Sequence, residues 1–226
     1  MIRSTALWIA LGAVAAGAAS AQEPRVEVGA GPVYARPTGS LGRYLSGTPG
    51  LGGFVVLGSG RRAVGWRLDG TFLHFSPNTA DRPFRGPQPI SITTGSQLFA
   101  ATGGPELRLR LGRLRLSAGA GAGLATSTNT GAVTGIAAQP RFSGASTFDA
   151  VTFAYTARAG VGVIVGGRAL PLRLELSTRY LNAGPTRWVR EGNLPVGYIS
   201  GVYVKPTTSP TTLLVYQLSV SVGVSR

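Results

Sequence analysis

The sequence contains no cysteine, a single lysine (Lys205) and a single histidine (His74). Without cysteine, disulfides and thiolate metal sites are excluded. No stretch after residue 21 is a continuous apolar run of roughly 18 residues, which excludes a helical membrane span in that part of the chain. Acidic residues are scarce, 8 against 22 lysines and arginines. Any fold of this chain must therefore accommodate a surplus of guanidinium groups.

The first 21 residues have the pattern of a secretory signal. Arg3 supplies a positive start, residues 6–18 are apolar or small, and Ala19-Ser20-Ala21 is a small-x-small cleavage site. An anchor helix is disfavoured because the apolar run is shorter than the roughly 20 residues a bilayer requires. We predict a cleaved signal peptide over 1–21 and one domain over 22–226. Export argues against a nucleic-acid partner despite the net charge of +14. An anionic membrane surface suits such a chain better.

The remainder of the chain alternates with period 2, which is typical of β-strands. The connections between strands alternate in length, short ones near 58–62, 111–112 and 166–169 and long ones at 36–50, 76–96, 126–149 and 183–211. Outer-membrane barrels have short periplasmic turns and long extracellular loops in this order. The predicted strands are 25–35, 51–58, 63–75, 97–110, 113–125, 150–165, 170–182 and 212–225.

One face of each well-defined strand carries no charge. In residues 170–180, for example, Leu172, Leu174 and Leu176 share a face, whereas Arg173 and Glu175 share the other. A charge facing lipid at mid-strand costs about 2–4 kcal/mol, so an uncharged face predicts contact with a bilayer. A soluble barrel would instead point its apolar face inward and wet its polar face. We favour the membrane barrel.

Aromatic residues are predicted to gather near one end of the strands, as an interfacial girdle requires. Odd-numbered strands would rise from the periplasm and even-numbered strands would descend. The aromatic residues of both sets therefore lie at the same end of the barrel. Trp66 alone falls near the opposite rim. The predicted girdle comprises Tyr34, Phe54, Phe72, Phe99, Phe153, Tyr155, Tyr180 and Tyr216.

With these features the chain resembles the small outer-membrane β-barrel families, including the OmpA-type transmembrane domain. The stretch Leu172-Arg173-Leu174-Glu175-Leu176-Ser177-Thr178-Arg179-Tyr180, followed by a long loop and a closing strand, carries the resemblance best. It implies an all-β fold, an eight-stranded antiparallel up-and-down transmembrane β-barrel with short periplasmic turns and long extracellular loops. It also implies a Gram-negative outer-membrane location and assembly by the barrel assembly machinery. The chain departs from the pattern by ending on Arg226 rather than on an aromatic residue.

The lumen of an eight-stranded barrel is just wide enough to be filled by side chains. Charges held there must be paired or hydrated. We therefore expect a structural arginine–carboxylate plug, with a gated polar pathway for ions or small solutes as the alternative. The predicted lumen set is Glu27, Arg67, Asp69, Glu106, Arg108, Arg158, Arg173, Glu175 and Arg179.

His74 and Ser76 share one face and resemble the His-x-Ser arrangement of the outer-membrane lipid A deacylases. In those enzymes imidazole deprotonates the serine and a carboxylate orients the imidazole. Here the only candidate for the orienting carboxylate is Asp81, and no acid occurs between Asp81 and Glu106. We therefore favour a girdle histidine followed by a loop-opening serine, and keep these two residues as remote catalytic candidates.

The predicted function is structural or surface interaction, without enzymatic activity, cofactor or metal. A small-solute channel is the second possibility. Expected partners are outer-membrane lipid, lipopolysaccharide and the barrel assembly machinery, and a monomer is expected. Basic loop residues could contact lipopolysaccharide phosphates through bidentate guanidinium pairs, and the alternative is a solvated set of loops with incidental charge. The basic residues are Arg36, Arg43, Arg82, Arg85, Arg141, Arg187, Arg190 and Lys205.

Overall fold

The computed structural model describes residues 26–43, 45–58, 63–83, 89–135, 143–165, 172–188 and 207–224. These residues form a closed antiparallel barrel of eight strands in sequence order, in which β1 also pairs with β8. The predicted signal peptide lies outside the described residues. The strands are β1 (Val26–Pro37), β2 (Thr48–Gly58), β3 (Val64–Pro83), β4 (Pro89–Leu111), β5 (Leu114–Gly135), β6 (Ser143–Ile164), β7 (Leu172–Trp188) and β8 (Thr207–Val224).

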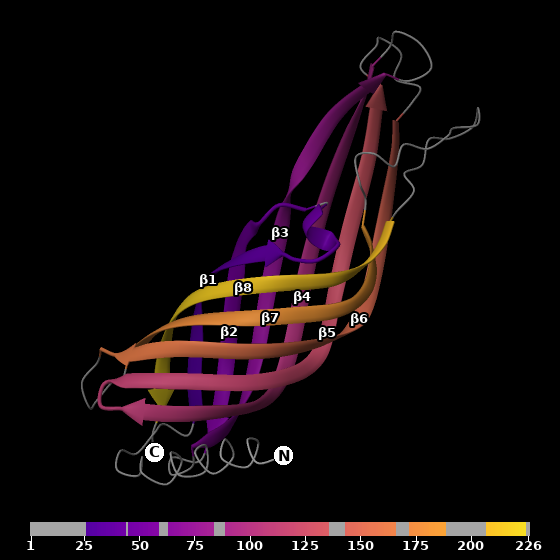
Figure 1. The fold of residues 1–226 in the computed structure, drawn as a ribbon. Helices are drawn as coiled ribbons and strands as arrows, with labels where there is room; N and C mark the ends of the chain where they lie inside the picture. The colour runs from indigo at the N-terminus through magenta and orange to yellow at the C-terminus, as the bar shows by residue number, and fades with distance from the viewer. Residues whose placement is uncertain are drawn as a thin grey trace, which may run out of the picture.

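Val26 and Val224 are opposite each other in the β1–β8 pair, so the described chain begins and ends at the same end of the barrel. We call this the lower end (Figure 1). It also carries the tightest connection, Gly112-Arg113, where Gly112 takes a φ of 64°. That left-handed conformation suits glycine because glycine has no Cβ. The only helical element in the described ranges is the 3-10 turn η1 (Leu41–Arg43), in the β1–β2 connection.

Period-2 alternation decides which side chains fill the barrel and which cover it. In β7, Arg173 and Glu175 are 4% and 1% exposed, whereas Leu174 and Leu176 are 44% and 55% exposed. Successive strand residues point to opposite faces, so the charges occupy the interior and the leucines the exterior. In this part of the barrel the polarity of the two faces is therefore the reverse of that in a soluble barrel. Apolar side chains cover the outer face and charged side chains face the lumen. No helix in the described part of the chain is long and apolar enough to cross a membrane.

The strands at one side of the barrel are longer than the sequence predicted. Pairing continues to Pro83↔Pro89 in β3–β4, to Ile90↔Gly135 in β4–β5 and to Thr134↔Ser143 in β5–β6. Much of the predicted loops 76–96 and 126–149 is therefore paired strand, not irregular loop, and so are both ends of the predicted loop 183–211, up to Trp188↔Thr207. These segments are rich in threonine, serine and glycine, so they lack apolar alternation. Threonine nevertheless favours strands because it is β-branched.

The extension forms an upper sheet that rises beyond the closed barrel, as Figure 1 shows for β3, β4, β5 and β6. The barrel walls on either side end earlier. The β2–β3 ladder ends at Gly50↔Leu73, and the β6–β7 ladder ends at Ala154↔Ala183. The upper sheet comprises residues 74–83 of β3, 89–97 of β4, 128–135 of β5 and 143–153 of β6.

Candidate functional site: a filled barrel interior

The barrel interior contains two layers of different chemistry. The charge layer lies nearer the lower end, and the apolar layer lies nearer the upper sheet. Along β3, for instance, Arg67 and Asp69 come before Leu73 and Phe75, and β7 shows the same order, with Glu175 before Leu181. The charge layer comprises Glu27, Arg67, Asp69, Glu106, Arg108, Arg115, Arg158, Arg173, Glu175 and Arg179.

Glu106 is a hub of the charge layer and is 0% exposed. It accepts a hydrogen bond from Arg108 Nε at 3.2 Å and a second one from Arg158. Arg67 Nη1 lies 3.6 Å and Arg115 Nη2 3.9 Å from its carboxylate oxygens. Four guanidinium groups thus surround one carboxylate. This arrangement stabilises the ionised carboxylate in a place that bulk water does not reach.

Glu27 and Glu175 link the opposite side of the charge layer. Glu27 accepts hydrogen bonds of 2.9 Å from both Arg115 and Arg173, and one of 2.6 Å from the Ser221 hydroxyl. Arg173 also reaches Glu175 at 2.7 Å. These contacts join β1, β5, β7 and β8 across the lumen. Bidentate guanidinium–carboxylate pairs of this kind are strong and directional.

Arg67 occupies the middle of the network. Its Nε donates to Asp69 at 2.9 Å and its Nη1 donates to Glu175 at 3.1 Å. The guanidinium carbon lies 3.5 Å from the centroid of the Phe54 ring. Arg179 reaches Asp69 at 3.5 Å and also donates to a threonine hydroxyl of β3. All the carboxylates of the layer are therefore connected through shared arginines.

Glycine makes room for the arginines. A Cβ at Gly65 would lie 2.7 Å from Arg108 Nη2, and a Cβ at Gly162 would lie 3.0 Å from Arg173 Cδ. Both glycines lie on the lumen face of their strands. A side chain at either position would displace the neighbouring arginine. Long arginines facing glycines thus fill the barrel without widening it.

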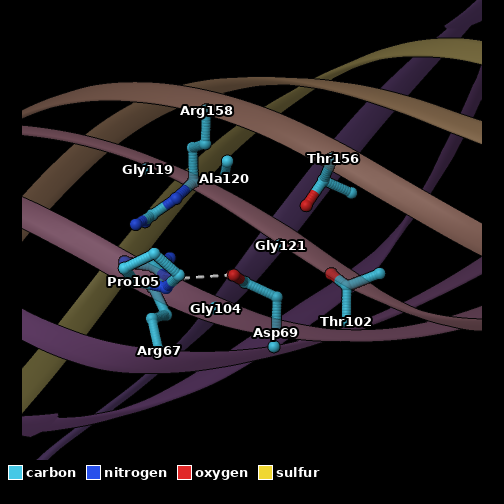
Figure 2. Close-up of a pocket in the computed structure, with 11 residues that line it drawn as sticks. Arg67, Asp69, Thr102, Gly104, Pro105, Gly119, Ala120, Gly121, Thr156 and Arg158 are labelled. Atoms are coloured by element: carbon cyan, nitrogen blue, oxygen red, sulfur yellow. Dashed lines mark hydrogen bonds and ion pairs between the residues drawn. The ribbon is translucent and has the colours of Figure 1, made fainter.

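A small cavity lies within the charge layer, with a volume of about 10 Å³. Figure 2 shows Arg67, Asp69 and Arg158 around it, with Thr102 and Thr156 at one side. A cavity of this size holds about one water molecule. At this point of the charge layer the described side chains leave space for little more than one water molecule.

The apolar layer closes the interior above the charges. Trp188 of β7 is 1% exposed and meets Phe75 of β3 edge-on, with ring centroids 5.9 Å apart. Leu41 of η1 is 0% exposed, so the β1–β2 connection folds inward and adds a side chain to this layer. The layer comprises Val33, Ala35, Leu41, Leu73, Phe75, Leu98, Ala100, Ala125, Ala154, Leu181, Ala183, Trp188, Leu213 and Val215.

The structure brings together all nine residues of the predicted lumen set. Arg115 completes their network but was not in that set, although its alternation phase on β5 placed it on the same face. The layer holds six arginines and four carboxylates, a formal surplus of two positive charges (6 − 4) among the described residues. Sequence reasoning missed the apolar layer, because its residues lie near or beyond the upper ends of the predicted strands, where no charge marks the inner face.

Phe54 was wrongly assigned to the girdle. It is 3% exposed and points into the lumen against Arg67. No residue of β2 is charged, so neither alternation phase of this strand was marked as the inner one. The other seven predicted girdle residues point outward, with exposures from 41% to 63%. They are Tyr34, Phe72, Phe99, Phe153, Tyr155, Tyr180 and Tyr216.

The remote catalytic candidates remain a hypothesis. His74 is exposed on the outer face of β3, and its backbone carbonyl accepts a hydrogen bond of 2.6 Å from the Thr48 hydroxyl. The side chains of Ser76 and Asp81 lie outside the described part. Among the described residues, no group of three or more His, Asp or Glu side chains is placed to hold a metal ion.

Comparisons with known proteins add little to this geometry. No family model and no curated protein matches the chain. Among solved structures the chain is similar to Neisserial surface protein A (NspA), with 13% sequence identity and a TM-score of 0.39. That match covers 89% of this chain and 97% of the other. At this TM-score the likeness supports no conclusion about function.

Proposed function

We propose that this chain is an integral outer-membrane β-barrel protein with a structural or surface-interaction role and no catalytic activity. Its lumen would serve as a scaffold, filled by the charge layer and closed by the apolar layer. The chain would then belong with the small outer-membrane barrels that its sequence resembles. The observation that carries the proposal is the distribution of polarity, which is apolar outside and charged inside.

The outer surface supports a lipid environment. Large apolar side chains more than 36% exposed occur on all eight strands, including Leu68, Leu116, Val161 and Leu218. A soluble protein rarely leaves so continuous an apolar surface uncovered. The exposed charged side chains among the described residues lie at or beyond the ends of this belt. They are Arg36, Arg43, Arg113, Asp149 and Arg187.

The upper rim supports contact with anionic lipid headgroups. Arg36, Arg43 and Arg187 are exposed there, on β1, η1 and β7. Guanidinium groups bind phosphates in bidentate fashion, so lipopolysaccharide phosphates are suitable ligands. The other basic residues of the predicted surface set have side chains outside the described residues.

An arginine placed on the belt tests the membrane proposal. Leu176→Arg should lower the free energy of unfolding from phospholipid vesicles by about 2–4 kcal/mol, because this position lies between the lower rim and the girdle. Reversible unfolding in guanidinium chloride measures the difference between the variant and the wild type. The mobility shift between folded and unfolded protein on a gel reports the folded fraction.

Leu111→Arg is the matched control, since Leu111 is 61% exposed but adjoins the tight lower turn. A charge near the interface costs about 0–1 kcal/mol. A soluble barrel tolerates an exposed arginine at either position, so equal and negligible effects of the two substitutions would exclude a lipid-facing belt.

The electrical conductance of the folded barrel distinguishes the scaffold role from the channel role. The folded barrel in a planar bilayer should show no discrete openings, because the paired side chains of the charge layer occupy the lumen and the apolar layer lies above them. Reproducible openings that change when Arg67 or Arg173 is neutralised would establish the channel and overturn the scaffold role.

A further inference from the structure

The charge layer is short of negative charge. Among the described residues its arginines outnumber its carboxylates by two, as counted above. The shortage is visible at Glu106, where one carboxylate is shared by four guanidinium groups. A buried charge is costly unless a group of opposite charge and hydrogen bonds compensate it. The electrostatics of the layer therefore favour the entry of a small anion.

The cavity beside Arg67 and Arg158 offers space for such an ion. Both side chains line it, and they are only 2% and 6% exposed. Arg67 Nη2 and Arg158 Nη1 have no hydrogen-bond partner among the described residues, although Arg158 Nη1 lies 3.7 Å from Glu175. A buried N–H without an acceptor is destabilising, and guanidinium groups only donate. An anion would supply the acceptor that these donors lack.

Two hydroxyl groups lie on the other side of the cavity. They belong to Thr102 of β4 and Thr156 of β6, and in Figure 2 both oxygens turn inward toward Gly121. A threonine hydroxyl can rotate to donate its hydrogen to an anion. The cavity therefore lies between cationic N–H donors and neutral O–H donors, a combination that suits a negatively charged ligand.

Asp69 also lines the cavity, but its charge is already compensated. Arg67 Nε donates to Asp69 Oδ1 at 2.9 Å, and Arg179 Nη1 lies 3.5 Å from the same oxygen. Figure 2 shows the carboxylate turned toward Arg67. The charged residues that line the cavity are Arg67, Arg158 and Asp69, so their net charge is positive.

The remaining wall of the cavity is largely bare backbone, and it limits the size of the ligand. Gly104, Gly119 and Gly121 line it without side chains. A Cβ at Gly121 would lie 3.1 Å from the Thr156 hydroxyl oxygen, between the hydroxyls and the arginines. The volume of about 10 Å³ corresponds to about one water molecule. A single-atom anion suits this space, whereas a polyatomic anion such as sulfate is too large.

We propose that the charge layer binds one halide ion, chloride under physiological conditions, between the guanidinium groups of Arg67 and Arg158 and the hydroxyls of Thr102 and Thr156. The ion accepts hydrogen bonds from donors that no described group accepts, and it halves the surplus of positive charge. A water molecule of similar size accepts the same hydrogen bonds but brings no charge. The inference rests on the charge layer of the barrel and not on the proposed membrane role.

Chloride should stabilise the folded barrel beyond any general effect of salt. The full-length protein is folded into phospholipid vesicles and unfolded with urea, which contains no chloride, while chloride replaces gluconate at constant ionic strength. Once the site is mostly occupied, each tenfold rise in chloride should raise the free energy of unfolding by about 1.4 kcal/mol, the value for one bound ion. Sulfate should act like gluconate. Equal stability in chloride and gluconate would overturn the proposal and assign the cavity to water.

Substitution of a hydroxyl by a methyl group locates the site. Thr156→Val keeps the shape of the side chain but removes a donor, so it should weaken chloride binding about tenfold. Thr102→Val should do the same. Thr178→Val is the matched control, because it makes the same change at an exposed position on the outer face of β7, and its chloride dependence should equal that of the wild type. An unchanged chloride dependence in both lumen variants would overturn the site.

Bromide shows the ion directly. Crystals of the wild-type protein grown in bromide should give an anomalous scattering peak between Arg158 and the two threonine hydroxyls, and crystals of Thr156→Val should give a weaker peak. The absence of a peak would overturn the proposal. A peak without any chloride dependence of stability would mean an adventitious ion only and would overturn it as well. None of these results bears on the Leu176→Arg comparison, so the ion site and the membrane role are tested separately.

Discussion

Replacing Glu106 by glutamine is expected to destabilise the folded barrel by about 3–5 kcal/mol, the cost of breaking a buried ion pair by removing one partner. Glu106 is 0% exposed and has four arginines around it. The amide retains the size of the side chain but loses its charge, so the surplus of positive charge in the layer rises by one. Unfolding of the barrel from phospholipid vesicles with guanidinium chloride as denaturant measures the change in the free energy of unfolding.

Two further variants show whether charge is the cause. Asp149→Asn removes a carboxylate that is exposed on the upper sheet and should leave stability nearly unchanged. The double variant Glu106→Gln/Arg158→Gln restores the charge balance and should recover part of the loss, since Arg158 is directly hydrogen-bonded to Glu106. A double variant that loses the sum of both single effects would contradict an electrostatic network.

Trp188→Ala is expected to cost about 3–5 kcal/mol, the range for removing a large aromatic side chain from a packed core. Trp188 is 1% exposed and packs edge-on against Phe75, so alanine leaves an unfilled space in the apolar layer. The same vesicle titration measures this loss. The variant should remain silent in a planar bilayer, because the charge layer beneath still fills the lumen.

Trp66→Ala provides the matched control. Trp66 is 63% exposed on the outer surface of β3 near the lower rim, so its removal creates no interior cavity. Its effect on stability should be clearly smaller. If Trp188→Ala instead produced discrete conductance, the apolar layer would be the gate of a channel, and the charge layer would not be a barrier.

The in–out assignment could be read from the sequence wherever a strand carries charge. In β7 the alternation of Arg173 and Glu175 with Leu174 and Leu176 marks both faces at once. The same signal would have added Arg115 to the lumen set, because it shares its phase on β5 with other inward residues. In β2, by contrast, no charge marks either phase, and Phe54 was placed outside although it stacks on Arg67 inside.

The limits of the strands could not be read in the same way. Apolar alternation ends where the belt ends, but hydrogen-bonded pairing does not require apolar side chains. The ladder from Leu98↔Ser127 up to Ile90↔Gly135 continues through threonine, serine and glycine. Strand pairing depends on the adjacent strand, which the sequence of one segment does not reveal.

The sequence alone determined the type of fold, because period-2 alternation with charge confined to one phase has few solutions other than a barrel with an apolar exterior. Tertiary structure alone decided which arginine meets which carboxylate, how Trp188 reaches Phe75 across the lumen, and how far the strands pair above the belt. The physical reason is that alternation is a local property of the backbone, whereas ion pairs, ring contacts and the extent of strand pairing depend on residues brought together only when the barrel closes.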